Sequence, residues 1–229
     1  MVDVLVIIPA RGGSKRLPRK NILPLINKPL IEYTINAAKN SKVVNRLMVS
    51  TDDEEIAKYA TSAGAEVPAL RPSHLAKDDS TSVDVCLHTL AEYQKNEGYE
   101  PDIIVLLQPT SPLRTEKHID EALEILETNN ADSVISVCPV EYSPNTLINI
   151  KQDGSITPYF SKSIIKKLQE EKFVCRLNGA IYAVKTEFLK KNKSFYSKNT
   201  FPYVMSPTSS IDIDTELDFQ FASFLMEKA

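Results

Sequence analysis

The most basic stretch of the sequence follows directly after its first apolar run. The segment PARGGSKRLPRKN, residues 9–21, holds five Lys and Arg side chains, two glycines and two prolines, and it follows the apolar run Val4–Ile8. Glycines let backbone N–H groups approach an anion closely, and Arg11, Lys15 and Lys20 can supply positive charge. This chemistry fits a triphosphate, although the spacing is neither that of a Walker loop nor that of a dinucleotide-binding loop. A solvated basic surface loop is the alternative interpretation of this stretch.

A second stretch, SIDIDTELD at residues 210–218, alternates carboxylates with isoleucines. In an extended strand Ile211 and Ile213 would face the core, and Asp212 and Asp214 would share the opposite side about 7 Å apart. Two carboxylates would repel a triphosphate unless a cation lay between them. Mg²⁺ binds one or two carboxylates together with phosphate oxygens. The pair therefore predicts a Mg²⁺ site.

A third stretch, LLQPTSPLR at residues 106–114, stops an apolar run with two prolines that bracket hydroxyl residues. Proline fixes the backbone, so such a turn holds Gln108 and Ser111 in set positions. We expect both side chains at the same edge of a sheet as the basic loop.

The second and third stretches each have a purely structural interpretation as well. Asp214 or Thr215 would cap a final helix that runs through Phe224. The turn would be an ordinary connection from a strand to a helix, with Thr115 or Ser111 as the cap. Only the combination of the three stretches favours a binding site.

The elements that must position these residues alternate between strands and helices. Amphipathic segments lie between short aliphatic runs, and this alternation predicts a mainly parallel, Rossmann-like α/β sheet flanked by helices. The expected strands are Val4–Ile8, Arg46–Ser50, Glu66–Leu70, Asp102–Leu107 and Ser133–Val137. The clearest helix is Glu116–Asn129, whose apolar residues recur at helical spacing. The basic loop then leaves the carboxyl end of the first strand, where open α/β sheets bind ligands.

One segment interrupts this pattern. From residue 139 to about residue 178, Pro144, Asp153-Gly154 and Pro158 punctuate short extended pieces. We interpret this segment as an excursion from a single domain that spans residues 1–229.

Composition limits the classes of function. The chain has 229 residues, 42% of them hydrophobic, which suits one large α/β domain. A net charge of −3 disfavours nucleic-acid binding, because that needs a broad basic surface. No apolar run near the start is long enough for a membrane span or a secretory leader, so we expect a cytoplasmic protein. The scattered cysteines argue against a disulfide framework or a zinc site; they are Cys86, Cys138 and Cys175.

Together these residues resemble the acylneuraminate cytidylyltransferases, which activate sialic acids and related nonulosonic acids as CMP-sugars for cell-surface polysaccharides. The resemblance runs almost from end to end. It rests on ARGGSK at 10–15 with Lys20 and Asn21, STD at 50–52, Arg71-Pro72 with Leu75-Ala76 and Asp78, QPTSPLR at 108–114, NGAIY at 178–182, and SIDIDTELD at 210–218. It implies a nucleotidyltransferase fold, Mg²⁺ dependence and a homodimer in which an arm reaches the partner's site. The excursion at 139–178 lies where that arm would be.

The resemblance also implies roles for individual residues. Arg11, Ser14, Lys15 and Lys20 match the phosphate-binding loop, and Asn21 lies near the ribose and the α-phosphate. Arg71, Ser80 and Ser82 match the surroundings of the cytosine. An arginine suits that base because cytosine offers O2 and N3 as acceptors, whereas uracil presents N3–H.

On the acceptor side, the resemblance places Gln108, Ser111, Arg176 and Asn178 near the sugar acid. The anomeric hydroxyl would attack the α-phosphate of CTP, and pyrophosphate would leave. Lys20, Asp212 and Asp214 are the expected catalytic residues, and the two aspartates are also the expected metal ligands. Positioning and charge neutralisation would supply most of the rate.

The sequence departs from the pattern in one place. The segment Lys162–Arg176 lacks an additional arginine that many relatives carry near the sugar carboxylate. Either Lys162, Lys166 or Lys167 replaces it, or the sugar differs, so legionaminic acid stands beside N-acetylneuraminic acid as a candidate. Lysine is a point charge and not a planar fork, so the replacement would alter recognition.

Two other functions are compatible with these patterns. The first is a nucleotidyltransferase that acts on a different sugar or on a sugar phosphate, which would require an anion site in place of the carboxylate site. The second is a non-catalytic nucleotide-binding protein, against which the presence of Lys20, Asp212 and Asp214 argues.

Overall fold

The chain folds around one six-stranded sheet. The computed structural model describes residues 2–161, 164 and 174–228. The strands lie in the order β10-β6-β9-β5-β1-β4. Their bounds are β1 Val4–Pro9, β4 Arg46–Ser50, β5 Ile103–Leu106, β6 Ser133–Pro139, β9 Cys175–Lys185 and β10 Thr200–Val204. All neighbours pair in parallel except β9, which runs antiparallel to β5 and β6. The predicted mainly parallel sheet is confirmed.

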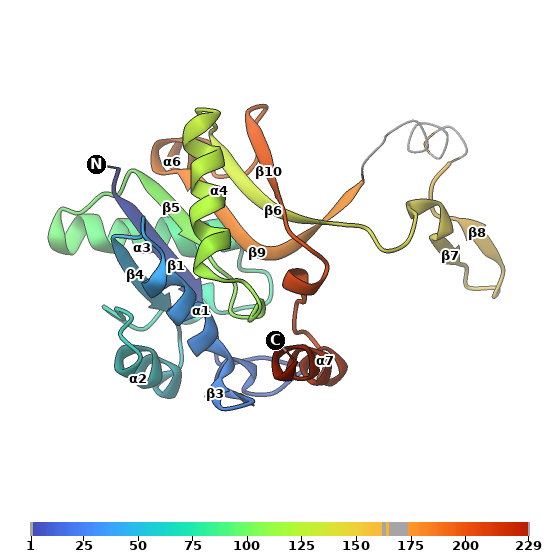
Figure 1. The fold of residues 1–229 in the computed structure, drawn as a ribbon, viewed down its shortest axis with the longest axis horizontal. Coiled ribbons are helices and arrows are strands. Elements are labelled where there is room, and N and C mark those ends of the chain that lie inside the picture. Colours follow the sequence, from blue (N-terminus) through green and yellow to red (C-terminus); the bar gives the residue numbers. More distant parts are fainter. Residues whose placement is uncertain (1, 162–163, 165–173, 229) are drawn as a thin grey trace.

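Helices cover both faces of this sheet (Figure 1). They are α1 Leu30–Asn40, α2 Glu54–Ser62, α3 Ser82–Glu97, α4 Glu116–Thr128, α6 Thr186–Asn192 and α7 Glu216–Glu227. Alternate residues of β1 enter two separate apolar clusters: Val6 and Ile8 pack with α1, α2 and α4, whereas Leu5 and Ile7 pack with α3 and α6. A strand that is buried on both faces needs a continuous apolar run, which explains the sequence of β1.

A third apolar cluster joins the loop after β1 to the end of the chain. Leu17 and Leu25 of that loop region are buried against Ile213 and Ala222. The same loop region contains the short elements η1 (Lys20–Ile22), β2 (Pro24–Leu25) and β3 (Lys28–Pro29). The basic loop is thereby anchored next to α7, far from it in sequence.

The predicted elements agree with the structure in most places. The expected helix at 116–129 is α4, and Asn129 is its C-cap. The expected strand Glu66–Leu70 is wrong, because only Glu66 forms a bridge, to Met48. Pro68 lacks the N–H that would continue such a strand. Strands β9 and β10 were not predicted.

The segment before α7 is extended but is not a strand of the sheet. The strand expected around Ile211–Asp214 is therefore wrong as secondary structure, although Ile213 is fully buried as expected. The backbone N–H of Ile213 donates to the carbonyl of Thr110 instead of to a neighbouring strand. The final helix runs to Glu227, beyond the expected Phe224.

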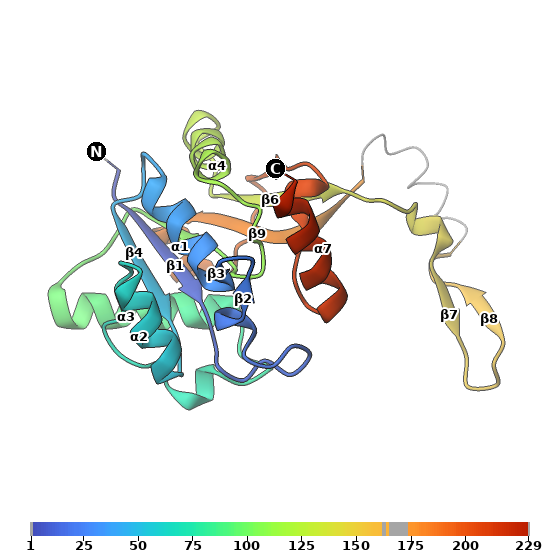
Figure 2. The same ribbon diagram turned by 60° about the horizontal axis from the view of Figure 1, so that its bottom comes forward.

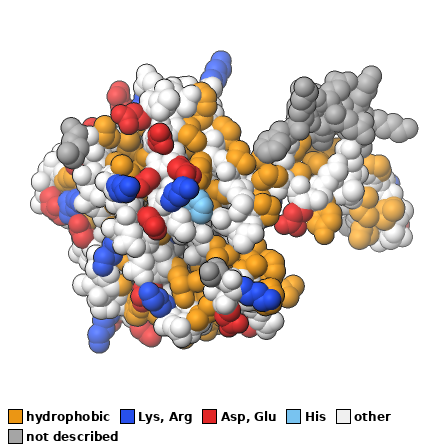
Figure 3. All heavy atoms as spheres, in the orientation of Figure 1, with side chains coloured by type: hydrophobic (Ala, Val, Ile, Leu, Met, Phe, Trp, Pro, Cys, Tyr) orange, Lys and Arg blue, Asp and Glu red, His pale blue; other side chains and the backbone are white. Residues whose placement is uncertain are grey.

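The hairpin β7 (Ile148–Ile150) and β8 (Ile156–Pro158) stands away from the sheet, next to η3 (Pro144–Thr146) (Figures 1 and 2). It lies within the predicted excursion. Figure 3 shows hydrophobic side chains gathered on this protruding part. Ile150 and Ile156 face each other across the hairpin and are 74% and 63% exposed. A role in dimerisation stays a prediction.

Within the described residues, none of the helices combines the length and the apolar character that crossing a membrane requires.

Candidate active site

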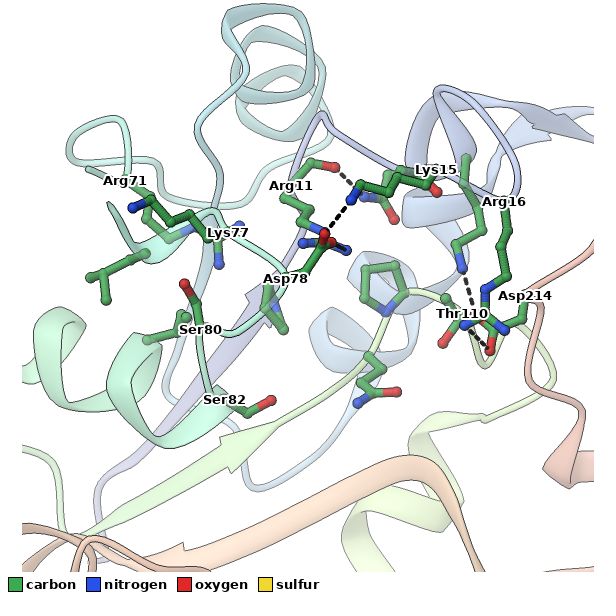
Figure 4. A pocket seen from close by; sticks show the side chains of 18 residues that line it. Arg11, Lys15, Arg16, Arg71, Lys77, Asp78, Ser80, Ser82, Thr110 and Asp214 are labelled. Carbon is green, nitrogen blue, oxygen red and sulfur yellow. Dashed lines mark hydrogen bonds and ion pairs between the residues drawn. The ribbon is translucent and has the colours of Figure 1, made fainter. Parts of the chain in front are cut away.

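A cleft of about 520 Å³ opens at the carboxyl ends of β1 and β5. Because parallel strands end at the same edge of a sheet, the loops after these two strands meet there. The lining includes most of the predicted site residues: Arg11, Ser14, Lys15, Lys20, Asn21, Arg71, Ser80, Ser82, Gln108 and Asp214. Figure 4 shows side chains from all these loops around the cleft.

Four of the five cations in the loop after β1 line the cleft, whereas the fifth, Arg19, pairs with Asp53 and Glu55. A guanidinium nitrogen of Arg11 lies 2.8 Å from one oxygen of Asp78, and Lys15 Nζ lies 2.5 Å from the other (Figure 4). The backbone N–H of Gly12 donates to Asp52 Oδ1 at 3.0 Å. A Cβ at Gly12 would lie 2.6 Å from an oxygen of Asp53, so only glycine fits there. The loop is thus tied down by carboxylates of neighbouring loops while four of its cations stay at the cleft.

Lys20 connects this loop to the segment before α7. Its Nζ donates to the carbonyl of Ile213 at 2.6 Å and to Asp214 Oδ1 at 3.0 Å, and the Lys20 side chain is only 12% exposed. Arg16 lies 2.8 Å from the other oxygen of Asp214. The Asn21 amide donates to the carbonyl of Arg11 at 3.0 Å and so fixes the base of the loop. Asp214 therefore lies between two cations.

Asp212 has different surroundings. Its Oδ1 atom is buried and has no hydrogen-bond partner among the described residues. Burial raises the pKa of Asp212, and the negative charge of Asp214 raises it further, while Thr110 and Lys20 act in the opposite direction. A buried carboxylate oxygen that lacks a hydrogen-bond partner is costly, so Oδ1 of Asp212 is suited to binding a cation.

Neither aspartate caps α7. The cap is Thr215, whose hydroxyl accepts from the backbone N–H of Asp218, and the Asp218 carboxylate accepts from the N–H of Thr215 at 2.7 Å. The capping interpretation therefore holds for Thr215 and is wrong for Asp214. Neither carboxylate is used as a helix cap: Asp214 pairs with Lys20 and Arg16, and Oδ1 of Asp212 has no hydrogen-bond partner in the described residues.

The donor set of these two aspartates fits Mg²⁺. Mg²⁺ uses one or two carboxylates and takes its remaining ligands from water and phosphate oxygens. In the described part of the chain, no group of three or more His, Cys, Asp or Glu side chains could hold a metal by itself. A metal here would consequently depend on ligand oxygens as well as on the protein.

Arg71 supplies unused donors at the other end of the cleft (Figure 4). The residue is 8% exposed, and its Nε and one terminal nitrogen are buried without a hydrogen-bond partner in the described residues. Burial lowers the pKa of Arg71, an effect opposed by the nearby Asp52. Ser80 and Ser82 lie beside it, and Thr81 between them caps α3. A planar acceptor group would satisfy the free donors of Arg71.

Of the residues predicted to contact the sugar, Gln108 lines the cleft. Its side chain lies against Gly179, because a Cβ added at Gly179 would come within 2.6 Å of Gln108 Oε1. Gly179 also has φ of +75°, so glycine is required at this position for two reasons. The cleft lining does not include Asp212, and it does not include the other three residues predicted to contact the sugar: Ser111, Arg176 and Asn178.

Of the last three residues, Ser111 and Asn178 are buried and Arg176 is partly exposed. Asn178 is buried, and its amide donates to Ser210 Oγ at 2.9 Å while its oxygen accepts from Ser136 Oγ at 2.6 Å. Arg176 donates to the carbonyl of Ser210 at 3.4 Å. Ser111 is fully buried. Asn178 and Arg176 thus support the segment that carries Asp212.

Several lining residues were not singled out from the sequence as binding residues. Arg16, Lys77, Asp78 and Thr110 all line the cleft. Arg16 lies within the basic stretch and Asp78 within a quoted motif, so both had a sequence signal. Thr110 lies within the quoted motif QPTSPLR and so had a signal as well, whereas Lys77 had none. The candidates Lys162, Lys166 and Lys167 for the sugar carboxylate lie outside the described residues.

Comparisons with known proteins agree on one family. A family model described as cytidylyltransferase matches residues 5–228. The chain is 39% identical to a CMP-N,N'-diacetyllegionaminic acid synthase of Legionella pneumophila, over 98% of this chain and 96% of the relative. It is 35% identical to an N-acylneuraminate cytidylyltransferase of Escherichia coli, over 98% of this chain but only 52% of that longer protein. A solved CMP:2-keto-3-deoxy-manno-octonic acid synthetase complexed with CTP superimposes with a TM-score of 0.72 at 19% identity, covers 99% of both chains and shows the shared fold.

Proposed function

The chain belongs to the cytidylyltransferase family, and from this premise we propose that it transfers CMP from CTP to the anomeric hydroxyl of a nonulosonic acid, with release of pyrophosphate. One observation carries the proposal. A single cleft brings together the cations of residues 11–20, the partnerless donors of Arg71 and the carboxylate of Asp214, with the Asp212 segment directly beside it. The cations would bind a triphosphate, the donors of Arg71 a base and the carboxylates a metal ion, all at one cleft.

The arrangement of these residues favours one orientation of CTP in the cleft. Arg71, Ser80 and Ser82 lie at one end, and we assign them to the cytosine. Arg11, Lys15 and Lys20 lie along the loop after β1, and we assign them to the phosphates. The free donors of Arg71 match O2 and N3 of cytosine, whereas the N3–H of uracil would oppose a donor.

We assign Mg²⁺ to Asp212 and Asp214. The partnerless Oδ1 of Asp212 and the like charge of Asp214 supply a reason for a cation at this point. When bound there, the ion would neutralise charge on the phosphate oxygens. Lys20 and Arg16, which already contact Asp214, place two further positive charges beside the same segment.

In the proposed reaction, a bond forms between the anomeric oxygen and the α-phosphorus, and the bond from that phosphorus to pyrophosphate breaks. The protein forms no covalent bond to the substrates in this scheme, so its contribution is positioning and charge neutralisation. Gln108 is the cleft-facing residue that we assign to the acceptor. Ser111, Arg176 and Asn178 would act indirectly, by fixing the loop of Gln108 and the segment of Asp212.

We also propose that the chain acts as a homodimer through the segment 139–178. The exposed isoleucines of the β7–β8 hairpin support this proposal, because a protruding apolar surface is typical of an interface. Because the reaction consumes CTP, we place the protein in the cytoplasm.

A pyrophosphate-release assay tests the proposed function. The protein is incubated with CTP and Mg²⁺, and N,N'-diacetyllegionaminic acid, N-acetylneuraminic acid or a sugar 1-phosphate is added in separate reactions. We expect release only with a nonulosonic acid. Release with the sugar 1-phosphate alone would establish the other nucleotidyltransferase function, and no release with any acceptor would support the non-catalytic alternative.

A further inference from the structure

Arg114 is one of the largest fully buried side chains in the described part of the molecule, at 2% exposure. It ends the turn after β5 and directly precedes Thr115, the N-cap of α4. One terminal nitrogen donates to the carbonyl of Gln108 at 3.1 Å and to the carbonyl of Ala180 at 3.2 Å. A guanidinium therefore lies inside the protein between two main-chain segments.

No carboxylate in the described residues forms an ion pair with Arg114. Its Nε and its other terminal nitrogen are buried and have no hydrogen-bond partner there. Burying a charge that is only partly hydrogen-bonded opposes folding, and an apolar side chain of similar size usually fills such a place at lower cost. Core packing alone therefore does not explain an arginine at this position.

The two carbonyls belong to residues that lie just past the last pair of the β5–β9 ladder. The β5–β9 ladder pairs Ile103 with Lys185 and ends at the pair Leu106 and Tyr182. The same register, continued by two residues, places Gln108 opposite Ala180. The strands β5 and β9 are no longer paired directly at this point. The Arg114 guanidinium instead connects them, because it donates to the carbonyls of both residues.

The bridge lies at the acceptor end of the cleft. Gln108 lines the cleft, and its Oε1 lies against Gly179, which directly precedes Ala180. Gly179 also lies close to Asp212, because a Cβ there would be 3.8 Å from Asp212 Oδ2. The separation of Gln108 from β9 consequently sets where the Gln108 amide stands relative to Asp212.

We propose that Arg114 is a positioning residue for the acceptor sugar: by bridging the carbonyls of Gln108 and Ala180 it fixes the opening between β5 and β9 and holds the Gln108 amide at the cleft. This inference rests on the proposed function. It predicts that Arg114 acts on acceptor binding and not on CTP binding, because its bonds reach Gln108 and β9 but no residue assigned to the nucleotide.

The test compares Arg114→Met with the parent, and with Arg46→Met as a matched control. Arg46, on the edge strand β4, is partly buried, and its partners are the carboxylates of Glu66 and Glu97. Steady-state kinetics are measured with CTP and N,N'-diacetyllegionaminic or N-acetylneuraminic acid, whichever the parent uses. For Arg114→Met we expect KM for the acid to rise at least about tenfold with KM for CTP within about twofold, because small displacements of a positioning group weaken binding strongly.

Thermal melts separate positioning from simple stabilisation. Removal of a buried, partly satisfied charge should leave the melting temperature of Arg114→Met level or higher. Arg46→Met should melt lower with both KM values unchanged. An Arg114→Met variant that melts lower and raises both KM values equally would overturn the inference and leave the proposed function standing.

A double-mutant cycle with Gln108→Ala identifies the route of the effect. If Arg114 acts through Gln108, Arg114→Met should add less than about twofold to the acceptor KM of Gln108→Ala, because effects that share one group are not additive. A full additional tenfold rise would overturn the inference.

Arg114→Lys is a second variant, which keeps the charge but not the planar fork. It should raise the acceptor KM less than Arg114→Met. If the methionine variant does not fold, Arg114→Lys replaces it in the same comparisons. A parent chain without turnover on either acid would instead contradict the proposed function.

Discussion

Lys20 Nζ lies 3.0 Å from Asp214 Oδ1, across 194 positions of the sequence. The same amine donates to the carbonyl of Ile213 at 2.6 Å. This contact joins the loop after β1 to the carboxylate segment before α7. It also distinguishes the two aspartates, because Asp214 is paired with cations while Oδ1 of Asp212 has no partner among the described residues.

Replacement of Asp212 by Asn should lower activity and raise stability. The charge that would hold Mg²⁺ is lost, so we expect kcat to fall about 100-fold or more. Because the folded-state pKa of Asp212 is raised above 3.8, the folded chain binds this proton more tightly than the unfolded chain, and ionised Asp212 destabilises the fold at neutral pH. Without metal, Asp212→Asn should therefore melt above the parent. Pyrophosphate release across a Mg²⁺ titration, beside thermal melts at pH 7, measures both effects.

Asp214→Asn is the matched comparison for this prediction. It should also lose activity, but it removes the partner of Lys20 and Arg16, so its melting temperature should not rise. A folded Asp212→Asn variant with the parental rate and the parental Mg²⁺ dependence would exclude Asp212 as a metal ligand.

Lys20→Ala should reduce kcat much more than stability. The amine lies at the cleft wall and would neutralise charge that develops toward pyrophosphate, so we expect a loss of about 100-fold in kcat. The ion pair with the partly exposed Asp214 contributes little to folding, and the melting temperature should change by only a few degrees. Parental activity in Lys20→Ala would favour the interpretation of residues 9–21 as a solvated surface loop.

Much of this site could be predicted from the sequence because its residues follow strands. Arg11 and Gln108 follow the apolar runs of β1 and β5, and parallel strands bring such loops to one edge. The contact between Lys20 and Asp214 had no local signal, because it depends on how Leu17 and Leu25 pack against Ile213. Asn178 could be assigned to the site region, but its burial depends on Ser136 and Ser210.

The elements that were predicted wrongly also have physical causes. Glu66–Leu70 has the composition of a strand, but Pro68 removes a donor from the ladder. Strand β9 contains Gly179 with positive φ, which breaks the β-strand pattern at the point where the site needs it. Such local departures are typical of functional positions.

Arg71→Gln should reduce the preference of the enzyme for CTP over UTP. The parent should prefer CTP over UTP by about 100-fold or more in kcat/KM, because a site with donors rejects a base that presents N3–H. A glutamine can offer a donor or an acceptor, so the preference should narrow to about tenfold or less. Competition between CTP and UTP in one reaction measures the ratio. Equal use of the two nucleotides by the parent would contradict the assignment of Arg71 to cytosine.

Protonation of His118 at low pH should destabilise the start of α4. Its Nδ1 accepts from the backbone N–H of Thr115 at 3.0 Å, and burial lowers the pKa of His118. The unfolded chain therefore binds this proton more readily, so stability is full above about pH 6.5 and is lost as the pH falls through the folded-state pKa. His118→Gln keeps an acceptor for the cap but does not titrate. Melting temperatures from pH 7.5 to 5 should fall less steeply for His118→Gln, and parallel curves would refute this role.

The β7–β8 hairpin should contribute to a dimer interface. Ile150 and Ile156 are exposed and directly opposite each other, so replacing both with Thr removes apolar surface while keeping residues suited to strands. Light scattering should show a dimer for the parent and a larger monomer fraction for the double variant. Leu217→Thr is the control, because Leu217 is 74% exposed on α7. A parent chain that is monomeric and fully active at micromolar concentration would contradict the prediction.

The most direct test of the central claim is identification of the product. The parent chain is incubated with CTP, Mg²⁺ and a panel of nonulosonic acids that includes N,N'-diacetyllegionaminic acid and N-acetylneuraminic acid, and the products are analysed by mass spectrometry. We predict a CMP-sugar with the mass of one of these acids joined to CMP, together with an equal amount of pyrophosphate, and neither product from Asp212→Asn at the same time point. Pyrophosphate without a CMP-sugar, or no product with any acid of the panel, would contradict the account.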